Sequence, residues 1–307
     1  MRPTILVTGA EGQIGFELVR LLAPHGDVVA ANRARLDLAR ADAIIAAVRG
    51  AKPALIINAG AYTAVDRAES EASAASAVNG RAPGILAEEA KRLGAVLIHY
   101  STDYVFDGAR STPYPEDAPP APLNVYGATK LEGERAIAAV GGHALVFRTS
   151  WVYGLRGKNF LLTVRRLAAE RDELSIVGDQ IGVPNWSHAL AEATVRIVAA
   201  GLSAAVDRAG LYHLSATGRA SWHEFAKAIV GDAARPRVVP ITTAEYPTPA
   251  RRPAYGVLAT RRFEATFGFG LDEWRETLAR CVATERAAQS SGAETAPASP
   301  SEKPASS

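Results

Sequence analysis

Short, almost wholly apolar runs alternate with longer segments of helical periodicity through the first half of the chain. The apolar runs predict five strands, at Thr4–Thr8, Asp27–Ala31, Ala54–Asn58, Ala95–Ser101 and Ala144–Ser150. Because they do not alternate with polar residues, they are typical of strands buried on both faces of a parallel sheet. The segments between them predict helices at Ile14–Leu22, Ala41–Arg49, Ala82–Arg92 and Tyr126–Ala139. This order predicts an α/β fold with a doubly wound, Rossmann-like parallel sheet.

The second half of the chain has a less regular pattern and predicts a smaller, mixed α/β domain. Its clearest elements are three predicted helices, at residues 187–202, 221–231 and 271–288. We expect a first domain over residues 1–150, to which the chain returns around residues 171–205, and a second domain mainly over residues 151–286. The second domain is expected at the carboxyl edge of the sheet, where open α/β sheets bind ligands. Residues 287–307 are rich in Ala, Ser and Pro and predict a disordered tail.

Composition and charge narrow the functional classes. The chain has 307 residues, 48% of them hydrophobic, which is enough for a large buried core. A formal net charge of +2 without a long basic run argues against nucleic-acid binding. The only cysteine, Cys281, excludes an internal disulfide and fits a reducing compartment. No signal-peptide pattern and no apolar run of about 20 residues is present, so we expect a cytoplasmic protein without a membrane partner.

A glycine-rich turn follows the first predicted strand. The stretch "TGAEGQIG" places Gly9, Gly12 and Gly15 where the strand passes into a helix, with Gln13 and Ile14 between them. Glycines allow the backbone to approach a pyrophosphate, and the helix N-terminus offers free N–H groups. The GxxGxxG spacing differs from the GxGxxG dinucleotide fingerprint. We interpret it as a dinucleotide-binding turn, with a plain glycine turn as the alternative.

The end of the second predicted strand bears on the choice of cofactor. It reads "AANRAR", with Asn32 and Arg33 where NAD-specific enzymes usually carry an acid. A guanidinium suits a 2′-phosphate, which favours NADPH and leaves NADH possible. A solvated basic turn is the alternative. Asp37 lies too far along the chain to be that acid, and we place it with Leu38 near the adenine.

The third predicted strand ends in "INAGAYTAVDRAES". Its small residues leave room for a flat cofactor, and the predicted cofactor contacts here are Ala59, Gly60, Ala61 and Thr63. Val65 and Asp66 follow where a helix begins, and we predict that they face the substrate. The alternative for Asp66 is that it only stabilises a helix N-terminus.

The fourth predicted strand and the next helix supply candidate catalytic groups. "HYSTDYVFDG" puts Thr102, Asp103 and Tyr104 at a strand end, unless this is an ordinary polar end. "NVYGATK" puts Tyr126 and Lys130 four residues apart on one helix face. A free tyrosine has a pKa near 10, and we expect the ammonium to lower the pKa of Tyr126. Tyr126 can then donate a proton to an alkoxide forming at a carbonyl while hydride arrives from the cofactor.

YxxxK alone is a common pattern, but its combination with the glycine turn and the hydroxyl-bearing strand end is specific. We therefore predict Thr102, Tyr126 and Lys130 as the catalytic residues, with Tyr126 and Lys130 also touching the cofactor. Thr102 is expected to hydrogen-bond the carbonyl oxygen of the substrate.

The chain resembles the extended short-chain dehydrogenase/reductases and, within them, the family of dTDP-4-dehydrorhamnose reductases. The resemblance covers roughly residues 1–285 and rests on "TAVDRAESE", "HYSTDYVFDG", "PLNVYGATKLEGE", "FRTSWVYG", "DQIGVP" and "YPTPARRP". It implies NADPH-dependent reduction of the 4-keto group of dTDP-4-dehydro-L-rhamnose to dTDP-L-rhamnose, a precursor of cell-surface polysaccharide. It also implies a Thr102–Tyr126–Lys130 trio, Tyr104 near the nicotinamide, and a sugar site lined by Val65, Asp66, Asp103 and Trp151.

The resemblance also raises the question of a metal. Some family members dimerise through a magnesium ion held by glutamates of both chains. This sequence has Glu17 and Glu285 at two of the matching positions and His188 at the third. Carboxylate oxygens suit magnesium and an imidazole does not, so we expect no magnesium bridge here, with Glu17 and Glu285 as the ligands that would hold one. A softer ion such as zinc, accepted through His188, is the alternative. The oligomeric state, monomer or homodimer, stays open.

Other functions share many of these motifs. A related dehydratase would need an Asp-Glu pair beside the threonine, where this chain has Asp103 and Tyr104. A related 4-ketoreductase could make another deoxysugar from its nucleotide sugar. A non-catalytic NADP-binding subunit, as in the regulatory subunit of methionine adenosyltransferase, is the alternative from a different class. Because Thr102, Tyr126 and Lys130 are all present, the sequence favours an enzyme.

Overall fold

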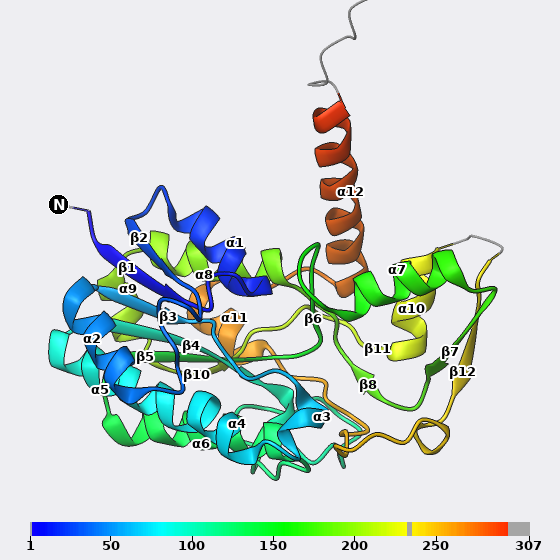
Figure 1. The fold of residues 1–307 in the computed structure, drawn as a ribbon, viewed down its shortest axis with the longest axis horizontal. Coiled ribbons are helices and arrows are strands. Elements are labelled where there is room, and N and C mark those ends of the chain that lie inside the picture. Colours follow the sequence, from blue (N-terminus) through cyan, green and yellow to red (C-terminus); the bar gives the residue numbers. More distant parts are fainter. Residues whose placement is uncertain (1, 232–234, 294–307) are drawn as a thin grey trace, which may run out of the picture.

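A six-stranded parallel sheet forms the centre of the computed structural model, which describes residues 2–231 and 235–293 (Figure 1). The spatial order is β10-β5-β4-β3-β1-β2. The strands are β1 (Thr4–Thr8), β2 (Asp27–Ala31), β3 (Leu55–Asn58), β4 (Val96–Thr102), β5 (Ala144–Thr149) and β10 (Gly210–His213). The predicted doubly wound fold is confirmed, and all five predicted strands are present. The sixth, β10, was not predicted because its short run contains Tyr and His.

Helices cover both faces of this sheet, since successive side chains of a strand point to opposite faces. Ile5 and Val7 belong to one core cluster, and Leu6 between them belongs to another. The first face is covered by α1 (Gln13–Leu22), α8 (Ser187–Ala199), α9 (Leu202–Asp207) and α11 (Arg261–Phe267). The second face is covered by α2 (Ala41–Ala51), α5 (Ala82–Leu93) and α6 (Val125–Val140).

Short helical segments follow the carboxyl ends of β3 and β4. They are α3 (Val65–Ala68), α4 (Ala72–Ser76), the π-helical turn η1 (Ala77–Arg81) and the 3₁₀ turn η2 (Asp103–Val105). The predicted helices on the sheet differ from the observed ones by a few residues at their ends. The helix predicted over 187–202 ends at Ala199, and α9 is separate; α2 continues to Ala51, and α6 begins at Val125.

The rest of the second half forms a smaller unit beside the carboxyl edge of the sheet (Figure 1). Its strands pair as β6 (Val152–Tyr153) with β9 (Asn185–Trp186), β7 (Glu173–Val177) with β12 (Arg237–Ile241), and β8 (Ile181–Gly182) with β11 (Ala220–Ser221). Its helices are α7 (Phe160–Glu170), α10 (Trp222–Val230), η3 (Thr243–Glu245) and α12 (Trp274–Ala293). Large aromatic side chains fill its core, among them Tyr153, Trp186, Phe225 and Trp274.

The ends of α10 and α12 bear on two sequence predictions. Ser221 and Glu224 form the predicted capping box at the start of α10. Helix α12 continues to Ala293, so residues 287–293 are helical, although the predicted tail included them. The remainder of that tail, residues 294–307, lies outside the described residues.

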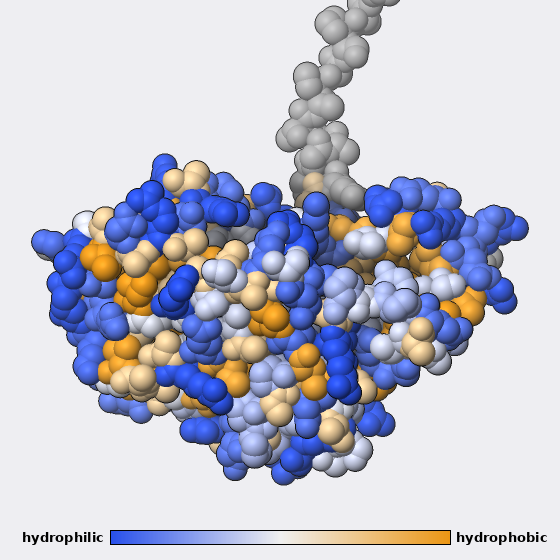
Figure 2. All heavy atoms as spheres, turned by 60° about the horizontal axis from the view of Figure 1, so that its bottom comes forward, coloured by the Kyte–Doolittle hydropathy of each residue, from blue (hydrophilic) through white to orange (hydrophobic). Residues whose placement is uncertain are grey.

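The surface shown in Figure 2 mixes hydrophilic residues with scattered hydrophobic ones. Among the described residues, the large hydrophobic side chains with high exposure are Val29 and Tyr246. In the same part of the chain, no helix is both long and apolar enough to cross a membrane.

Candidate active site

The glycine turn packs backbone against backbone at the carboxyl ends of β1 and β3. Gly9 has a φ of +62°, and a Cβ there would lie 2.6 Å from the Cα of Gly60. A Cβ on Gly15 would lie 2.1 Å from the carbonyl oxygen of Gly9. Gly12 is the N-cap of α1, and no side chain caps the first amides of the helix. The turn is therefore a cradle without side chains, and it fits a pyrophosphate.

The end of β2 lies beside this turn. Asn32 donates to the Glu11 carboxylate over 2.7 Å and accepts from the backbone N–H of Arg35. Arg33 is exposed, and none of the described residues binds its guanidinium. Asp37 is only partly exposed and accepts from the backbone N–H of Ala39. Glu11 was not predicted from the sequence, because its contact with Asn32 depends on how the glycine turn folds.

The other predicted cofactor residues surround the same cradle. Leu38 is buried, and a Cβ on Gly60 would lie 2.6 Å from its Cδ1. Gln13 donates to the carbonyl oxygen of Val152, and its own Oε1 is buried without a partner among the described residues. Two further predicted residues, Ile14 and Ala59, pack against the core of the first face. The last two are less buried, since Ala61 is partly exposed and Thr63 is exposed.

Thr102 and Tyr126 meet at the carboxyl edge of the sheet. Thr102 ends β4 and donates to Asp103 Oδ1 over 3.1 Å, and its hydroxyl also hydrogen-bonds the phenol of Tyr126. The ring of Tyr104 packs edge-on against that of Tyr126, with centroids 5.7 Å apart. The Asn124 side chain caps α6 by accepting from the N–H of Gly127. The sequence prediction that these groups come together at one place is consistent with this geometry.

The electrostatics of Tyr126 differ from the expectation. Burial raises the pKa of the Tyr126 phenol to about 12; the hydrogen bond with Thr102 lowers it, and the charge of Asp103 raises it. The prediction that Lys130 lowers this pKa is therefore wrong for this structure, because the ammonium points elsewhere and burial dominates.

Lys130 is buried behind the tyrosine. Its Nζ donates to the carbonyl oxygen of Tyr100 over 2.5 Å and lies 3.3 Å from Nε2 of His99. Burial lowers the pKa of Lys130 to about 8, against the opposing charge of Glu134. Burial also holds the pKa of His99 well below its usual value, with Lys130 acting in the same direction. His99 was not predicted, because it stands within an apolar strand sequence.

Asp103 is a buried carboxyl group beside Thr102. Its Oδ2 has no partner among the described residues, and a Cβ on Gly256 would lie 2.5 Å from it. Burial raises the pKa of Asp103 to about 7, although hydrogen bonds from Thr102 and the backbone act to lower it. An unpaired buried oxygen here is available to a hydroxyl group of a ligand.

Trp151 stands at the border between the sheet and the second unit. Its ring stacks on that of Trp222, with centroids 3.5 Å apart and an angle of 8° between the planes. A Cβ on Gly182 would lie 2.4 Å from the ring, so only glycine fits below it. The backbone of Trp151 has a φ of +43°, a conformation that costs a non-glycine residue free energy. The position of this partly exposed ring is thus strongly determined by its surroundings.

Val65 and Asp66 begin α3 beside the same edge. Asp66 makes a bidentate ion pair with Arg252, over 2.8 and 3.0 Å, and accepts from the N–H of Ala250. Arg252 lies 186 residues further along the chain and belongs to the segment "TPARRP". Asp66 therefore ties the loop after β3 to the second unit, and Val65 stays partly exposed next to it.

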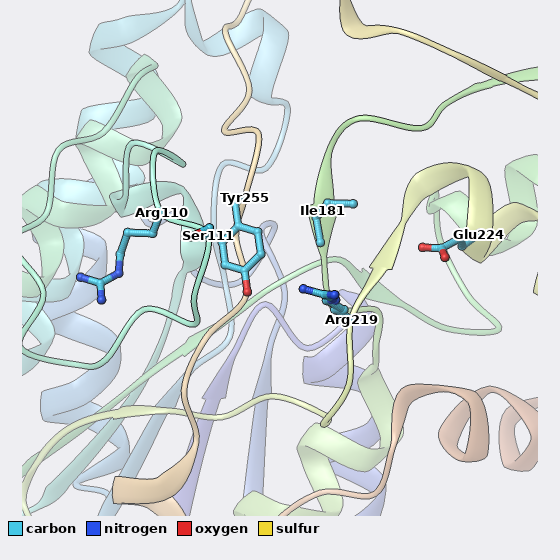
Figure 3. Close-up of a pocket in the computed structure, with 6 residues that line it drawn as sticks. All are labelled: Arg110, Ser111, Ile181, Arg219, Glu224 and Tyr255. Atoms are coloured by element: carbon cyan, nitrogen blue, oxygen red, sulfur yellow. The ribbon is translucent and has the colours of Figure 1, made fainter.

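A pocket of about 510 Å³ lies between the loop after η2 and the second unit (Figure 3). In Figure 3, Tyr255 stands between Arg110 and Ile181. The lining residues are Arg110, Ser111, Ile181, Arg219, Glu224 and Tyr255. Two guanidiniums against one carboxylate give it a positive lining. Gly256, next to the lining residue Tyr255, abuts Asp103 at the carboxyl edge of the sheet.

The three residues considered for a magnesium site already have partners within this chain. Glu17 accepts from Arg20 over 3.0 Å and lies 2.8 Å from Nδ1 of His188. Glu285 is paired with Arg165 over 2.5 Å. Over residues 2–231 and 235–293, no three His, Cys, Asp or Glu side chains converge as metal ligands. Each carboxylate is already neutralised by a guanidinium, so this arrangement does not fit magnesium.

Comparisons with known proteins add to this geometry. Residues 1–287 match the family described as RmlD substrate binding domain. The dTDP-4-dehydrorhamnose reductase of Burkholderia thailandensis is 49% identical over 290 residues, which cover 91% of this chain and 97% of that protein. The protein of the same name from Escherichia coli K12 is 42% identical, with 91% and 96% covered. The crystal structure of dTDP-4-dehydrorhamnose reductase from Bacillus anthracis in complex with NADP superposes with a TM-score of 0.87 at 35% identity, covering 92% of this chain and all of that one.

Proposed function

The chain belongs to the RmlD family of dTDP-4-dehydrorhamnose reductases, and from this we propose that it reduces the 4-keto group of dTDP-4-dehydro-L-rhamnose with NADPH. The product is dTDP-L-rhamnose, and the reaction is the last step of its biosynthesis. The observation that supports the proposal is the placement of the Thr102 and Tyr126 hydroxyls together at the carboxyl edge of the sheet that also carries the glycine turn. We also propose that the enzyme works in the cytoplasm, where reduced nicotinamide cofactor is supplied.

Gly9, Gly12 and Gly15 would hold the pyrophosphate of the cofactor, and Arg33 would hold its 2′-phosphate. Leu38 and Asp37 would lie near the adenine, and the small residues after β3 would pass beneath the cofactor. When bound, NADPH supplies the hydride that is added to C4 of the sugar. The chain's own residues must then place the ketone and deliver one proton to its oxygen.

Tyr126 is the proposed proton donor. Its O–H bond breaks as the carbonyl oxygen becomes an alkoxide, and the proton moves from the phenol to that oxygen. Thr102 hydrogen-bonds the same oxygen and fixes its position relative to the phenol. A phenol buried at this edge keeps its proton until a basic oxygen arrives, which is consistent with its raised pKa.

We propose two roles for the Lys130 ammonium. It stabilises the phenolate that Tyr126 becomes, and it binds the nicotinamide ribose. In the structure it is held on the Tyr100 carbonyl and beside His99, within the same buried edge. A positive charge next to a developing phenolate is worth most in a site that excludes water.

The sugar is proposed to lie against Trp151, Asp103, Val65 and Asp66. The rigid, stacked ring of Trp151 supplies a flat apolar surface, and the unpaired oxygen of Asp103 supplies a hydrogen-bond acceptor. The bond between Asp66 and Arg252 indicates that Asp66 positions the site wall as well as facing it.

The test is to incubate the purified chain with NADPH and dTDP-4-dehydro-L-rhamnose and to identify the sugar product by NMR. We expect stoichiometric NADPH oxidation and the L-rhamno configuration. A product with another configuration at C4 would assign the chain to a different deoxysugar. Binding of NADP without turnover would support a non-catalytic subunit and refute the proposal.

A further inference from the structure

Four buried side chains form a continuous hydrogen-bonded chain beneath the catalytic edge. Thr8 Oγ1 donates to Asn58 Oδ1 over 2.6 Å, and Asn58 Nδ2 lies 3.0 Å from Nδ1 of His99. His99 Nε2 lies 3.3 Å from Nζ of Lys130. Thr8, Asn58 and His99 are each 1% exposed and Lys130 is 2% exposed, so water does not complete these contacts. Three neighbouring strands supply the first three residues, and Asn58 and His99 are paired in the β3–β4 register.

The directions of the hydrogen bonds determine which nitrogen of His99 carries its proton. Thr8 gives its hydroxyl hydrogen to Asn58 Oδ1, and the amide N–H of Gly60 lies 3.3 Å from Thr8 Oγ1. Asn58 Nδ2 then donates to His99 Nδ1, so this nitrogen is an acceptor and the ring proton is on Nε2. Nε2–H points at Nζ of Lys130, which can accept it only as a neutral amine.

The opposite direction of these hydrogen bonds is the one that fits Lys130 as an ammonium. An ammonium must donate to His99 Nε2, which places the ring proton on Nδ1. Nδ1–H then needs an acceptor, and Asn58 provides one when its amide turns by half a rotation, with its nitrogen toward Thr8. The contacts between neighbouring residues are retained with donors and acceptors exchanged, and the hydroxyl hydrogen of Thr8 then needs another acceptor.

We propose that the chain from Thr8 to Lys130 switches between these two directions, one matched to the amine of Lys130 and the other to its ammonium, and that His99 is thereby a positioning residue of the reductase site. The catalytic meaning of this inference rests on the proposed function, but the switch itself is a property of the free protein. It allows Lys130 to gain or lose a proton without leaving two buried donors facing one another.

The surroundings of Lys130 make both charge states accessible. Its pKa is lowered to about 8 by burial, while Glu134 on the next turn of α6 favours the ammonium. Glu134 is itself neutralised by Arg148 of β5, over 2.6 and 2.9 Å. Tyr126 lies one turn before Lys130 on this face of α6, and Asp103 of η2, whose pKa burial raises to about 7, acts on Tyr126. The direction of the hydrogen bonds therefore acts on an equilibrium in which the amine and the ammonium of Lys130 already have similar free energies.

The far end of the chain reaches the floor of the cofactor cradle. Gly60, whose N–H bonds Thr8, is also the residue against which Gly9 packs. In the reversed direction, the hydroxyl oxygen of Thr8 accepts from both the Gly60 N–H and the Asn58 amide, and its own hydrogen needs another acceptor. Contacts at this floor thus bear on the charge of Lys130, through groups that never touch the substrate.

The direct test uses the unaltered chain without cofactor, in which the ¹⁵N shifts of the imidazole report the tautomer of His99. The spectra are recorded from pH 6 to 10, together with the ¹³Cε shift of Lys130, which is assigned by its absence in Lys130→Met. We expect His99 to change from the Nδ1–H to the Nε2–H form as Lys130 loses its proton. A single tautomer throughout this range would overturn the proposal.

A second test fixes the direction. Asn58→Asp presents only acceptors to His99 and holds the ring proton on Nδ1, so the Lys130 midpoint should rise by at least one pH unit. The same substitution in a His99→Leu background measures the effect of charge alone, and there we expect less than half of that rise. An unchanged midpoint, or an equal rise in both backgrounds, would contradict the switch.

Turnover of the variants separates this inference from the proposed function. His99→Gln can present either an oxygen or a nitrogen to Lys130 and should retain most of kcat, whereas His99→Leu should lose at least tenfold and show a displaced pH profile. Thr194→Val is the matched control, because it removes another buried hydrogen bond of β4, to the Tyr100 hydroxyl. Inactivity of the unaltered chain would refute the proposed function alone; equal activity and identical pH profiles of the two His99 variants would refute the role of His99.

Discussion

Two polar clusters of this protein each contain a histidine, and the two histidines have opposite electrostatic environments. At the carboxyl edge of the sheet, His99 is fully buried and has the Asn58 amide and the Lys130 side-chain nitrogen as partners. On the surface of α1 and α8, His188 lies between Glu17 and Glu192, with its ring nitrogens 2.8 and 3.2 Å from their carboxylates. The first environment excludes charge from the ring, and the second is a network of ions.

The consequences of this difference appear in the neighbouring groups. At the edge, burial governs: it lowers the pKa of Lys130 and His99 and raises that of Tyr126. At the surface, burial acts to raise the pKa of Glu17, but hydrogen bonds from His188 and Arg20 outweigh it and lower the pKa overall. A protein can therefore keep a neutral, directional network in its interior and a self-neutralising ionic network outside. Changes at the edge should cost function, and changes at the surface should cost little.

The largest effect is expected from Tyr126→Phe. The ring and its packing against Tyr104 remain, and only the proton donor is lost, so kcat should fall by about 10²–10⁴-fold. NADPH affinity, measured by fluorescence titration, should change little. Tyr153→Phe is the matched control, because it removes a buried phenol hydroxyl whose partner is Thr277 in the second unit. A Tyr126→Phe enzyme with near wild-type kcat at saturating substrate would disprove the assignment.

Lys130→Met should affect two quantities at once. The ammonium is proposed to stabilise the phenolate and to bind the nicotinamide ribose, so both kcat and NADPH affinity should fall, each by at least tenfold. Lys91→Met is the control, since that exposed lysine of α5 bonds the Val140 carbonyl at the end of α6. Loss of kcat with unchanged cofactor affinity would show that Lys130 does not reach the ribose.

The sequence predicted this edge better than the contacts beneath it. The strands are recognisable because burial on both faces makes them continuously apolar, and Tyr126 and Lys130 are linked by local helical spacing. Asn58 and His99 are 41 residues apart and meet only through strand register. Asp66 and Arg252 are 186 residues apart, and no local pattern connects them. The sign of the Tyr126 pKa shift also depends on burial, which the sequence does not display.

Arg33→Ala probes an exposed group that is still proposed to bind the cofactor. A hydrogen bond to a charged group contributes about 1.5–3 kcal/mol, so NADPH affinity should fall roughly tenfold to hundredfold. NADH affinity should be nearly unchanged. Arg40→Ala, which removes another exposed guanidinium, paired with Asp42, is the control. Equal losses for both cofactors would make Arg33 a general contributor without selectivity for the 2′-phosphate.

A buried histidine in the sheet should also influence acid stability. Burial lowers the pKa of His213 to about 3, so the unfolded chain binds a proton near pH 6.5 that the folded chain does not. Stability from this residue is complete above pH 6.5 and is lost as the pH falls, by about 1.4 kcal/mol at pH 5.5. The raised pKa of Asp103 has the opposite effect on stability over the same pH range. Asp103 is present in both wild type and His213→Gln, so its effect cancels when the two are compared. Urea denaturation of wild type and His213→Gln should show this difference between pH 7.5 and 5.5, and parallel pH dependences would contradict it.

The smallest effect is expected from removing metal ions. Glu17 is engaged by Arg20 and His188, and Glu285 by Arg165, so neither offers magnesium a free carboxylate. Magnesium prefers oxygen ligands in a near-octahedral arrangement, which an imidazole at position 188 does not supply. Chelation by EDTA should therefore leave both the activity and the mass measured by light scattering unchanged. His188→Glu is the matched variant, because it restores the third carboxylate and removes the imidazole, and a response to magnesium should appear there first. If EDTA halves the mass of the unaltered protein and its activity falls, a metal-bridged dimer exists, and the surface network is a metal site after all.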